Sequence, residues 1–198
     1  MNDAAWLLLV YRVPSEPSRV RVGVWRELKR LGGLYLQSAC CILPVRPGLA
    51  DAVDAVRARI AADGGASTLL RLTAQPDGVD DELTAAFRDL ATKEYAEIIE
   101  ECEMKFVREI EFERFRGNYT FEEAEEIRAD LDKIRRWLDR VHTRDFFAAP
   151  GHAEAEAWVA HCAQLMEAFE ADVYDRTAGG RDDRSPPAPM PIKPPPKP

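Results

Sequence analysis

The sequence lacks the features of a secreted or membrane-spanning chain. Its 198 residues include only four cysteines, and none of them form a C-x-x-C pair. No zinc knuckle or redox pair is therefore predicted, and the cysteines are interpreted as small buried residues of a reducing compartment. No apolar run approaches the roughly 20 residues of a membrane-spanning helix, and the early run WLLLV is too short for a signal-peptide core. We expect a cytoplasmic protein with no membrane partner.

Sequence motifs of catalysis are missing as well. The chain has no G-x-S-x-G, no glycine-rich phosphate loop and no H-E-x-x-H. Its three histidines, His142, His152 and His161, fall in an acidic region and are interpreted as surface and loop residues, not as metal ligands. We expect a protein that is not an enzyme and that uses neither a cofactor nor a metal.

Charge is divided unevenly along the chain. Residues 1–75 contain ten Lys and Arg against six Asp and Glu, whereas residues 76–198 contain seventeen against twenty-nine. The whole chain has a formal net charge of -8. This asymmetry predicts two lobes with different tasks.

Residues 1–75 show the pattern of an α/β lobe. An apolar strand is followed by a basic helix that ends at Gly32–Gly33, and then by one strand or two short strands that turn near Gln37–Ser38. A second helix and a last strand complete the series. The order β-α-β(β)-α-β fits a ferredoxin-like sandwich. The predicted strand regions are Trp6–Val13, Leu34–Leu43 and Ser67–Ala74, and the second helix is predicted at Leu49–Ala62.

Residues 79–176 are predicted to be helical throughout, as an antiparallel helical hairpin or a three-helix bundle. The first helix runs from near Glu82 to Phe115, with Asp80 as its cap, and Thr120–Glu123 forms a capping box for the second. Apolar residues then recur at alternating steps of three and four, which is typical of antiparallel helix packing. These residues are Ile127, Leu131, Ile134, Leu138 and Val141 in the second helix, and Ala155, Trp158, Cys162, Leu165 and Phe169 in the third. The fold class is α+β.

Residues 177–198 form the third predicted segment. Eight prolines occur in the fourteen positions from 185 to 198, so this segment is interpreted as a disordered or polyproline II tail. A P-x-x-P partner site at residues 191–194 is the alternative.

The basic helix is the main candidate site. Arg19, Arg26 and Arg30 follow at steps of seven and four and share one helical face. Val22, Trp25, Leu28 and Leu31 are predicted to form the opposite face, toward the core. Concentrated Arg and Lys bind DNA phosphates or a small oxyanion; the alternative is a solvated helix that pairs with the acidic lobe. The predicted binding residues are Arg12, Arg19, Arg21, Arg26, Lys29 and Arg30.

A second cationic group, Arg136, Arg140 and Arg144, ends the second helix of the bundle. Arg136 and Arg140 are one turn apart, which suits a secondary anion clamp. A favourable interaction with the helix dipole explains the same pattern. The adjacent Phe146 and Phe147 are expected to dock their loop on the bundle.

The run WLLLVYRVPSEPSRVRVGVWRELKRLGGLYLQSACCILP, with TFEEAEEIRADLDKIRRWLDRV, RDFFAAPG and AEAEAWVAHC further on, resembles the N-terminal domain of ChrB, the chromate-resistance regulator family. The resemblance covers about residues 6–174. It implies transcription regulation of a chromate efflux operon by DNA binding that chromate modulates. ChrB proteins usually carry a second, C-terminal domain, so a separate protein with that domain is a possible partner.

A weaker similarity links the chain to the ferredoxin-like domains of the phenylacetate repressors and of the CRISPR adaptation endonucleases. Those nucleases bind metal through an Asp at the end of the first strand, where this chain has Val10-Tyr11-Arg12. Metal-dependent nuclease activity is therefore not expected.

The leading hypothesis is a ChrB-like regulator that contacts operator DNA through its basic helix and responds to chromate. A second is a protein that binds chromate or sulfate and no DNA. A third is an interaction module that forms a homodimer, or docks a partner, through the helical bundle.

Overall fold

A computed structural model describes residues 6–16, 18–73 and 77–178 of the chain. The last helix extends to Ala178, and the rest of the predicted proline-rich tail lies outside the described residues. The chain divides into two compact units. The sheet unit comprises Met1–Asp89 with Arg144–Phe147, and the bundle unit comprises Leu90–Thr143 with Ala148–Pro198.

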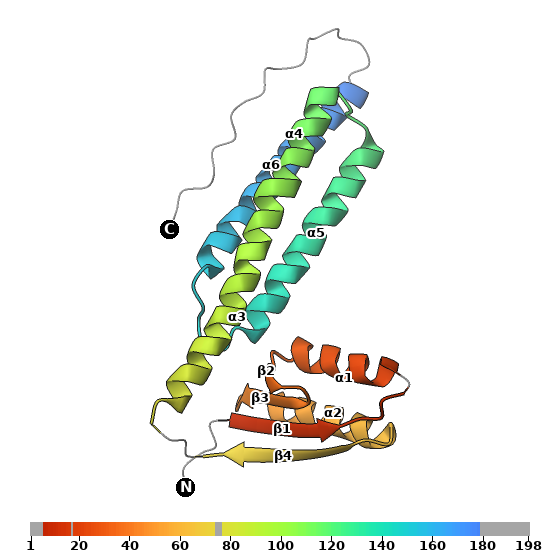
Figure 1. Ribbon diagram of the computed structural model, residues 1–198. Coiled ribbons are helices and arrows are strands. Elements are labelled where there is room, and N and C mark those ends of the chain that lie inside the picture. The colour runs from red at the N-terminus through yellow and green to blue at the C-terminus, as the bar shows by residue number, and fades with distance from the viewer. Residues whose placement is uncertain (1–5, 17, 74–76, 179–198) are drawn as a thin grey trace. The chain divides into compact units, whose positions relative to one another are not determined.

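The sheet unit has the predicted ferredoxin-like topology (Figure 1). Its four strands are antiparallel in the order β2-β3-β1-β4. The first and last strands of the unit are therefore neighbours, as in a split β-α-β fold. The turn predicted near Gln37–Ser38 separates β2 from β3. The elements are β1 (Trp6–Arg12), α1 (Ser18–Arg30), β2 (Leu34–Gln37), β3 (Cys40–Pro44), α2 (Leu49–Ala62) and β4 (Ala66–Leu72).

The two faces of the sheet carry different cores. Alternation along β1 sends Leu7 and Leu9 toward α1 and α2, and Trp6 and Leu8 to the other face. The helix-covered core lies between the sheet and the two helices, with Val24 and Leu28 from α1 and Val53, Val56 and Ile60 from α2. Leu7 and Leu9 are fully buried there.

Aromatic residues cover part of the second face. The Trp6 ring lies 5.7 Å from that of Phe87 in α3 (Val79–Glu101) and 5.8 Å from that of Phe147. Trp6 Nε1 donates a hydrogen bond of 2.7 Å to Asp80 Oδ1. The expectation that Phe146 and Phe147 dock on the bundle is therefore wrong. They belong to the sheet unit, because the face that α1 and α2 leave open supplies the apolar surface they pack on.

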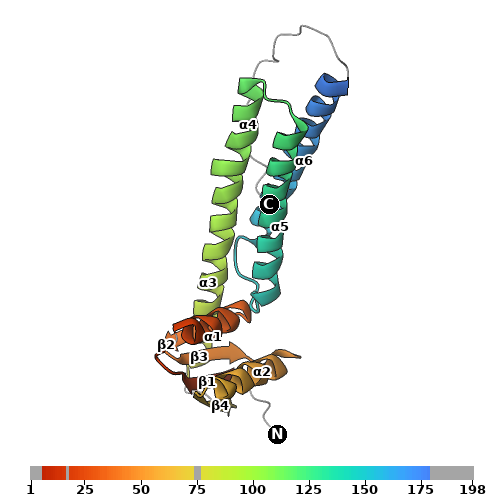
Figure 2. The same ribbon diagram turned by 90° about the vertical axis from the view of Figure 1, so that its right-hand side faces the viewer.

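The bundle unit is the predicted antiparallel three-helix bundle (Figures 1 and 2). The first helical segment of the bundle consists of α3 from Leu90 onward, a π-helical turn η1 (Cys102–Phe106) and α4 (Val107–Arg116). The second and third helices are α5 (Phe121–Arg144) and α6 (His152–Ala178). The predicted seam residues of α5 are all buried. No helix in the described part of the chain is long and apolar enough to cross a membrane.

Local signals explain where these helices begin and end. Glu123 N donates to Thr120 Oγ1 at 3.2 Å, as the capping box predicts. α4 ends at Gly117, whose φ of 69° is left-handed and therefore favours glycine. Glu113 is buried near this end, and Asn118 Nδ2 donates to it at 2.6 Å. The π-helical turn was not predicted, because its five residues continue the apolar pattern of the helices on either side.

Replacing Phe87 with Ala tests the aromatic cover of the sheet. Phe87 contacts Trp6, Phe146 and Phe147, and deleting a buried Phe side chain costs about 3–5 kcal/mol. We expect a loss of this size in the free energy of unfolding of the sheet unit, measured by urea denaturation. The control is Phe115→Ala, because Phe115 is 84% exposed and should change stability by no more than about 0.5 kcal/mol. A loss below about 1 kcal/mol for Phe87→Ala would show that these rings do not hold the unit together.

Candidate nucleic-acid interface

The orientation of α1 differs from the prediction. Val20, Val24 and Leu28 are its buried residues, at steps of four, whereas Val22 is 42% exposed and Trp25 is 49% exposed. The prediction that Val22 and Trp25 face the core is therefore wrong. The helix has two apolar stripes that meet at Leu28, one at steps of four (Val20, Val24) and one at steps of three (Val22, Trp25). The sheet buries only the stripe at steps of four.

Close packing beside Gly23 accompanies this orientation. A Cβ atom at Gly23 would lie 2.6 Å from Nη2 of Arg59, a residue of α2. The Arg59 guanidinium therefore occupies the space that a side chain at position 23 would take, which brings the Gly23 side of α1 close to α2. The opposite side of α1 carries Trp25 and stays in solvent.

The exposed side of α1 combines apolar and cationic residues. Val22 lies at its centre, three residues from Arg19 and Trp25 and four from Arg26, and Arg19 and Arg26 also flank Gly23. We call Arg19, Val22, Trp25 and Arg26 the α1 face. All four are exposed, and Lys29 and Arg30 continue the stripe toward the end of the helix. The predicted shared face of Arg19, Arg26 and Arg30 is thus on the solvent side.

The cations of α1 differ in how they are engaged. Arg30 donates two hydrogen bonds to Glu27, at 3.1 and 2.7 Å, and these lower the pKa of the Glu27 carboxyl. Lys29 lies 5.8 Å from the centre of the Tyr35 ring. Arg19, Arg21 and Arg26 form no ion pair with any described residue. These three arginines of α1 are therefore available to an external anion.

Two further predicted residues lie apart from Arg19 and Arg26. Arg12 alternates with Tyr11 along β1, so it lies with Val10 on the face of the sheet opposite α1. Arg21 is exposed and lies five residues from Arg26 and two from Arg19, so it neighbours Trp25, one helical turn further on, and not these two arginines. The structure therefore does not group Arg12 or Arg21 with Arg19 and Arg26.

The second predicted cluster is divided between the two units. Arg136 and Arg140 are exposed residues of α5 in the bundle unit. Arg144 belongs to the sheet unit, where its Cβ lies 2.8 Å from the position that a Cβ of Gly32 would take. Gly32 has a φ of 81°, so this close approach coincides with a backbone conformation that favours glycine. All three arginines lie on α5 at steps of four, and the secondary anion clamp stays a prediction.

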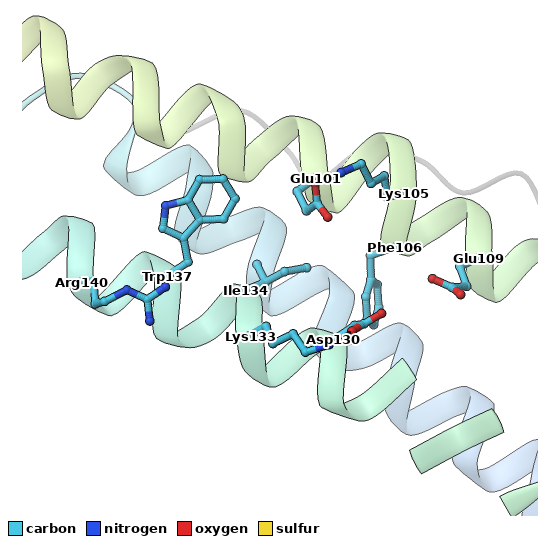
Figure 3. A pocket seen from close by; sticks show the side chains of 9 residues that line it. All are labelled: Glu101, Lys105, Phe106, Glu109, Asp130, Lys133, Ile134, Trp137 and Arg140. Carbon is cyan, nitrogen blue, oxygen red and sulfur yellow. Dashed lines mark hydrogen bonds and ion pairs between the residues drawn. The ribbon is translucent and has the colours of Figure 1, made fainter. Parts of the chain in front are cut away.

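Arg140 lines a groove of about 510 Å³ in the bundle. Figure 3 shows the Trp137 indole reaching from α5 toward the helix that carries Glu101 and Lys105. Three acidic and three basic side chains line the groove, and four of them are paired with each other, Lys105 with Glu101 and Lys133 with Asp130. The groove has no net positive charge, so it is poorly suited to a dianion. Its lining residues are Glu101, Lys105, Phe106, Glu109, Asp130, Lys133, Ile134, Trp137 and Arg140.

The family of the chain follows from comparison with known proteins. The family described as "Protein ChrB, N-terminal" matches residues 21–180. The chain belongs to this family. It is also 29% identical over 154 residues to Protein ChrB of Cupriavidus metallidurans, an alignment that covers 78% of this chain and 44% of that protein. The chain thus matches less than half the length of this curated relative. No solved structure matches.

The ChrB match includes most of the candidate interface. It begins at Arg21, inside α1, so Trp25, Arg26, Lys29 and Arg30 lie within the matched range. The match also spans the complete bundle from α3 to α6. Among the described residues of this ChrB-family chain, no group of three or more His, Cys, Asp and Glu is placed to hold a metal ion.

The reactivity of the four cysteine thiols tests how tightly each unit is packed around them. Cys41 is fully buried under α1, and burial raises the pKa of its thiol to about 12. At pH 8 only about one such thiol in ten thousand is ionised, and the thiolate is the reactive form. Cys102 and Cys162 are fully buried as well, whereas Cys40 is partly exposed.

We expect a thiol reagent at pH 8 to modify Cys40 in the native protein and all four cysteines after denaturation. Mass spectrometry of the labelled peptides measures this directly. The matched variant Cys40→Ser should abolish the rapid labelling of the native protein. Rapid modification of Cys41 would contradict the packing described for α1.

Proposed function

We propose that this ChrB-family chain is a non-enzymatic, cytoplasmic regulatory protein of chromate resistance that binds DNA through the α1 face. The observation that supports it is the pair of exposed, unpaired arginines, Arg19 and Arg26, on a helix that the core holds from its other side. Arginine is suited to phosphate because its guanidinium forms charge-assisted hydrogen bonds with two oxygens at once.

The spacing of the two arginines favours a polymer over a small ion. Seven residues of α-helix separate them by roughly 10.5 Å along the axis. Two guanidinium groups anchored that far apart on a rigid helix are better placed to contact two separate phosphates of a strand than the oxygens of one chromate or sulfate ion. The groove in the bundle is charge-balanced. We therefore propose DNA, and not a free oxyanion, as the ligand of this chain.

Charge distribution supports the same choice of surface. Residues 1–75 carry an excess of basic residues, while the remainder of the chain carries twelve more acidic than basic residues. Within the bundle, Arg114 pairs with Asp172, and Arg128 pairs with Glu170. By net charge, phosphates are thus attracted by residues 1–75, which include α1, and repelled by the acidic remainder of the chain.

The chromate response is a separate part of the proposal. Phosphate contacts position a protein on DNA and carry no sequence information, so operator choice needs further contacts. The matched region covers 44% of the ChrB relative. We propose that the region of ChrB beyond this match, or a partner that carries it, supplies the response to chromate.

Replacing both Arg19 and Arg26 with Ala tests the DNA-binding surface. Each phosphate contact contributes about 0.9 to the slope of log affinity against log salt. We expect the double variant to bind duplex DNA from the protein's own operon more weakly, with a slope shallower by about 1.8. Fluorescence anisotropy at several salt concentrations measures both quantities.

The matched control for this experiment removes the same charge elsewhere. Lys105 and Lys133 are exposed, ion-paired residues of the bundle, and the double variant Lys105→Ala/Lys133→Ala should bind DNA as the wild type does. Equal affinity and equal slope for the wild type and the Arg19→Ala/Arg26→Ala variant would refute the proposed surface.

A further inference from the structure

Trp25 is an unusual residue for the centre of a cationic surface. It is 49% exposed, although the helix is already anchored by Val20, Val24 and Leu28. The fold therefore does not require a large aromatic ring at this position. Single exposed apolar residues are common in proteins. A half-exposed tryptophan next to unpaired arginines is a more specific combination.

The other exposed aromatic residues of the described chain have different surroundings. Phe115 is the most exposed of them, and the adjacent Arg114 and Arg116 are both paired with carboxylates, Asp172 and Glu113. The guanidinium of Arg116 also lies 5.2 Å from the centre of the Phe112 ring. The arginines near Phe112 and Phe115 are already engaged, whereas Arg21 and Arg26 beside Trp25 form no ion pair with any described residue.

The geometry of the α1 face matches a single DNA strand. Arg19 and Arg26 are roughly 10.5 Å apart along the helix axis, so they can hold two different phosphates of one strand. Trp25 lies one residue before Arg26 and one helical turn after Arg21. Phosphates held by Arg21 and Arg26 would bring the nucleotide between them next to the indole.

The state of that nucleotide decides whether the indole contributes. In an intact duplex both faces of a base are covered by its neighbours, so a ring on the surface of a helix reaches no base face. In a single strand, a base can stack on an aromatic side chain, and such stacking is tolerant of sequence. The exposed ring therefore favours DNA whose bases are unpaired.

We propose that Trp25 is a base-stacking residue and that the α1 face prefers DNA with unpaired bases over intact duplex. This inference rests on the proposed DNA binding and names the form of DNA that the surface selects. Val22, 42% exposed and three residues before Trp25, extends the apolar surface beside the ring. Lys29 and Arg30, on the other side of Trp25, are held by Tyr35 and Glu27.

The test compares four probes of one sequence with the full chain: an intact duplex, the same duplex with three central unpaired nucleotides, the single DNA strand, and the single RNA strand. Fluorescence anisotropy at fixed salt gives each affinity. We expect the two DNA probes with unpaired bases to bind at least about fivefold more tightly than the duplex, the lower bound for stacking one base on an aromatic ring.

Variants at position 25 separate stacking from other contacts. Trp25→Leu keeps an apolar side chain without a flat ring and should abolish the preference for unpaired bases. Trp25→Phe keeps a ring and should retain part of it. Both variants should leave the salt slope unchanged, since no charge is altered. Phe115→Ala is the matched control, and near-ultraviolet circular dichroism verifies that each variant is folded.

Several results would overturn the inference. These are equal wild-type affinity for duplex and unpaired DNA, an undiminished preference in Trp25→Leu, and tighter binding of the RNA strand than of the DNA strand. In the first two cases, weaker binding by Arg19→Ala/Arg26→Ala would still support the proposed function. Failure of every DNA probe to bind the wild type would reject the proposed function itself.

Discussion

The structure of the candidate site depends on one packing constraint: the sheet buries only one of the two apolar stripes of α1. Val20, Val24 and Leu28 occupy the buried stripe, and Val24 and Leu28 share a core with Leu7 and Leu9 of β1. Their burial contributes about 1.5–3 kcal/mol for each fully buried side chain. The second stripe, with Val22 and Trp25, remains in solvent beside Arg19 and Arg26. A rotation of the helix by a third of a turn would bury Trp25 and remove the surface.

Electrostatics then distinguishes the two units. In the bundle, basic side chains such as Arg128 and Lys133 pair with carboxylates of the same unit, Glu170 and Asp130. In the sheet unit, Glu27 engages Arg30 and leaves Arg19 and Arg26 unpaired among the described residues. Surface ion pairs contribute little to stability, so their main consequence here concerns binding. The ion pairs of the bundle reduce its attraction for an external anion. The arginines of the α1 face have no such pairs with described residues, so this face still attracts anions.

Much of the fold could be predicted from the sequence. The alternation of strands and helices in the sheet unit, the capping box at Thr120 and the seam from Ile127 to Val141 each follow from a local pattern. The buried face of α1 could not be predicted from the sequence pattern, because apolar steps of three and of four both include Leu28. Only the sheet and α2, which brings Arg59 against Gly23, select between them.

The misplaced residues share a physical cause. Phe146 and Phe147 follow a helix of the bundle, yet they pack on Trp6 and Phe87, contacts between residues far apart in the sequence. The groove beside the π-helical turn likewise depends on residues from two helices, including Phe106 and Trp137. Arg12 is displaced from the predicted cluster by strand alternation once the covered face of the sheet is known. Such long-range relations leave no periodic signal in the sequence.

The most direct test of DNA binding by the α1 face is a proton–nitrogen NMR spectrum of the four tryptophan indoles during titration with single-stranded DNA. Trp6 and Trp158 are buried, and Trp137 lies in the groove of the bundle. The Trp25→Phe variant assigns the resonance of Trp25. We predict that DNA shifts the Trp25 resonance and leaves those of Trp137 and Trp158 unchanged. A titration in which Trp25 does not move while Trp137 does would contradict the account, because it would place the DNA on the bundle.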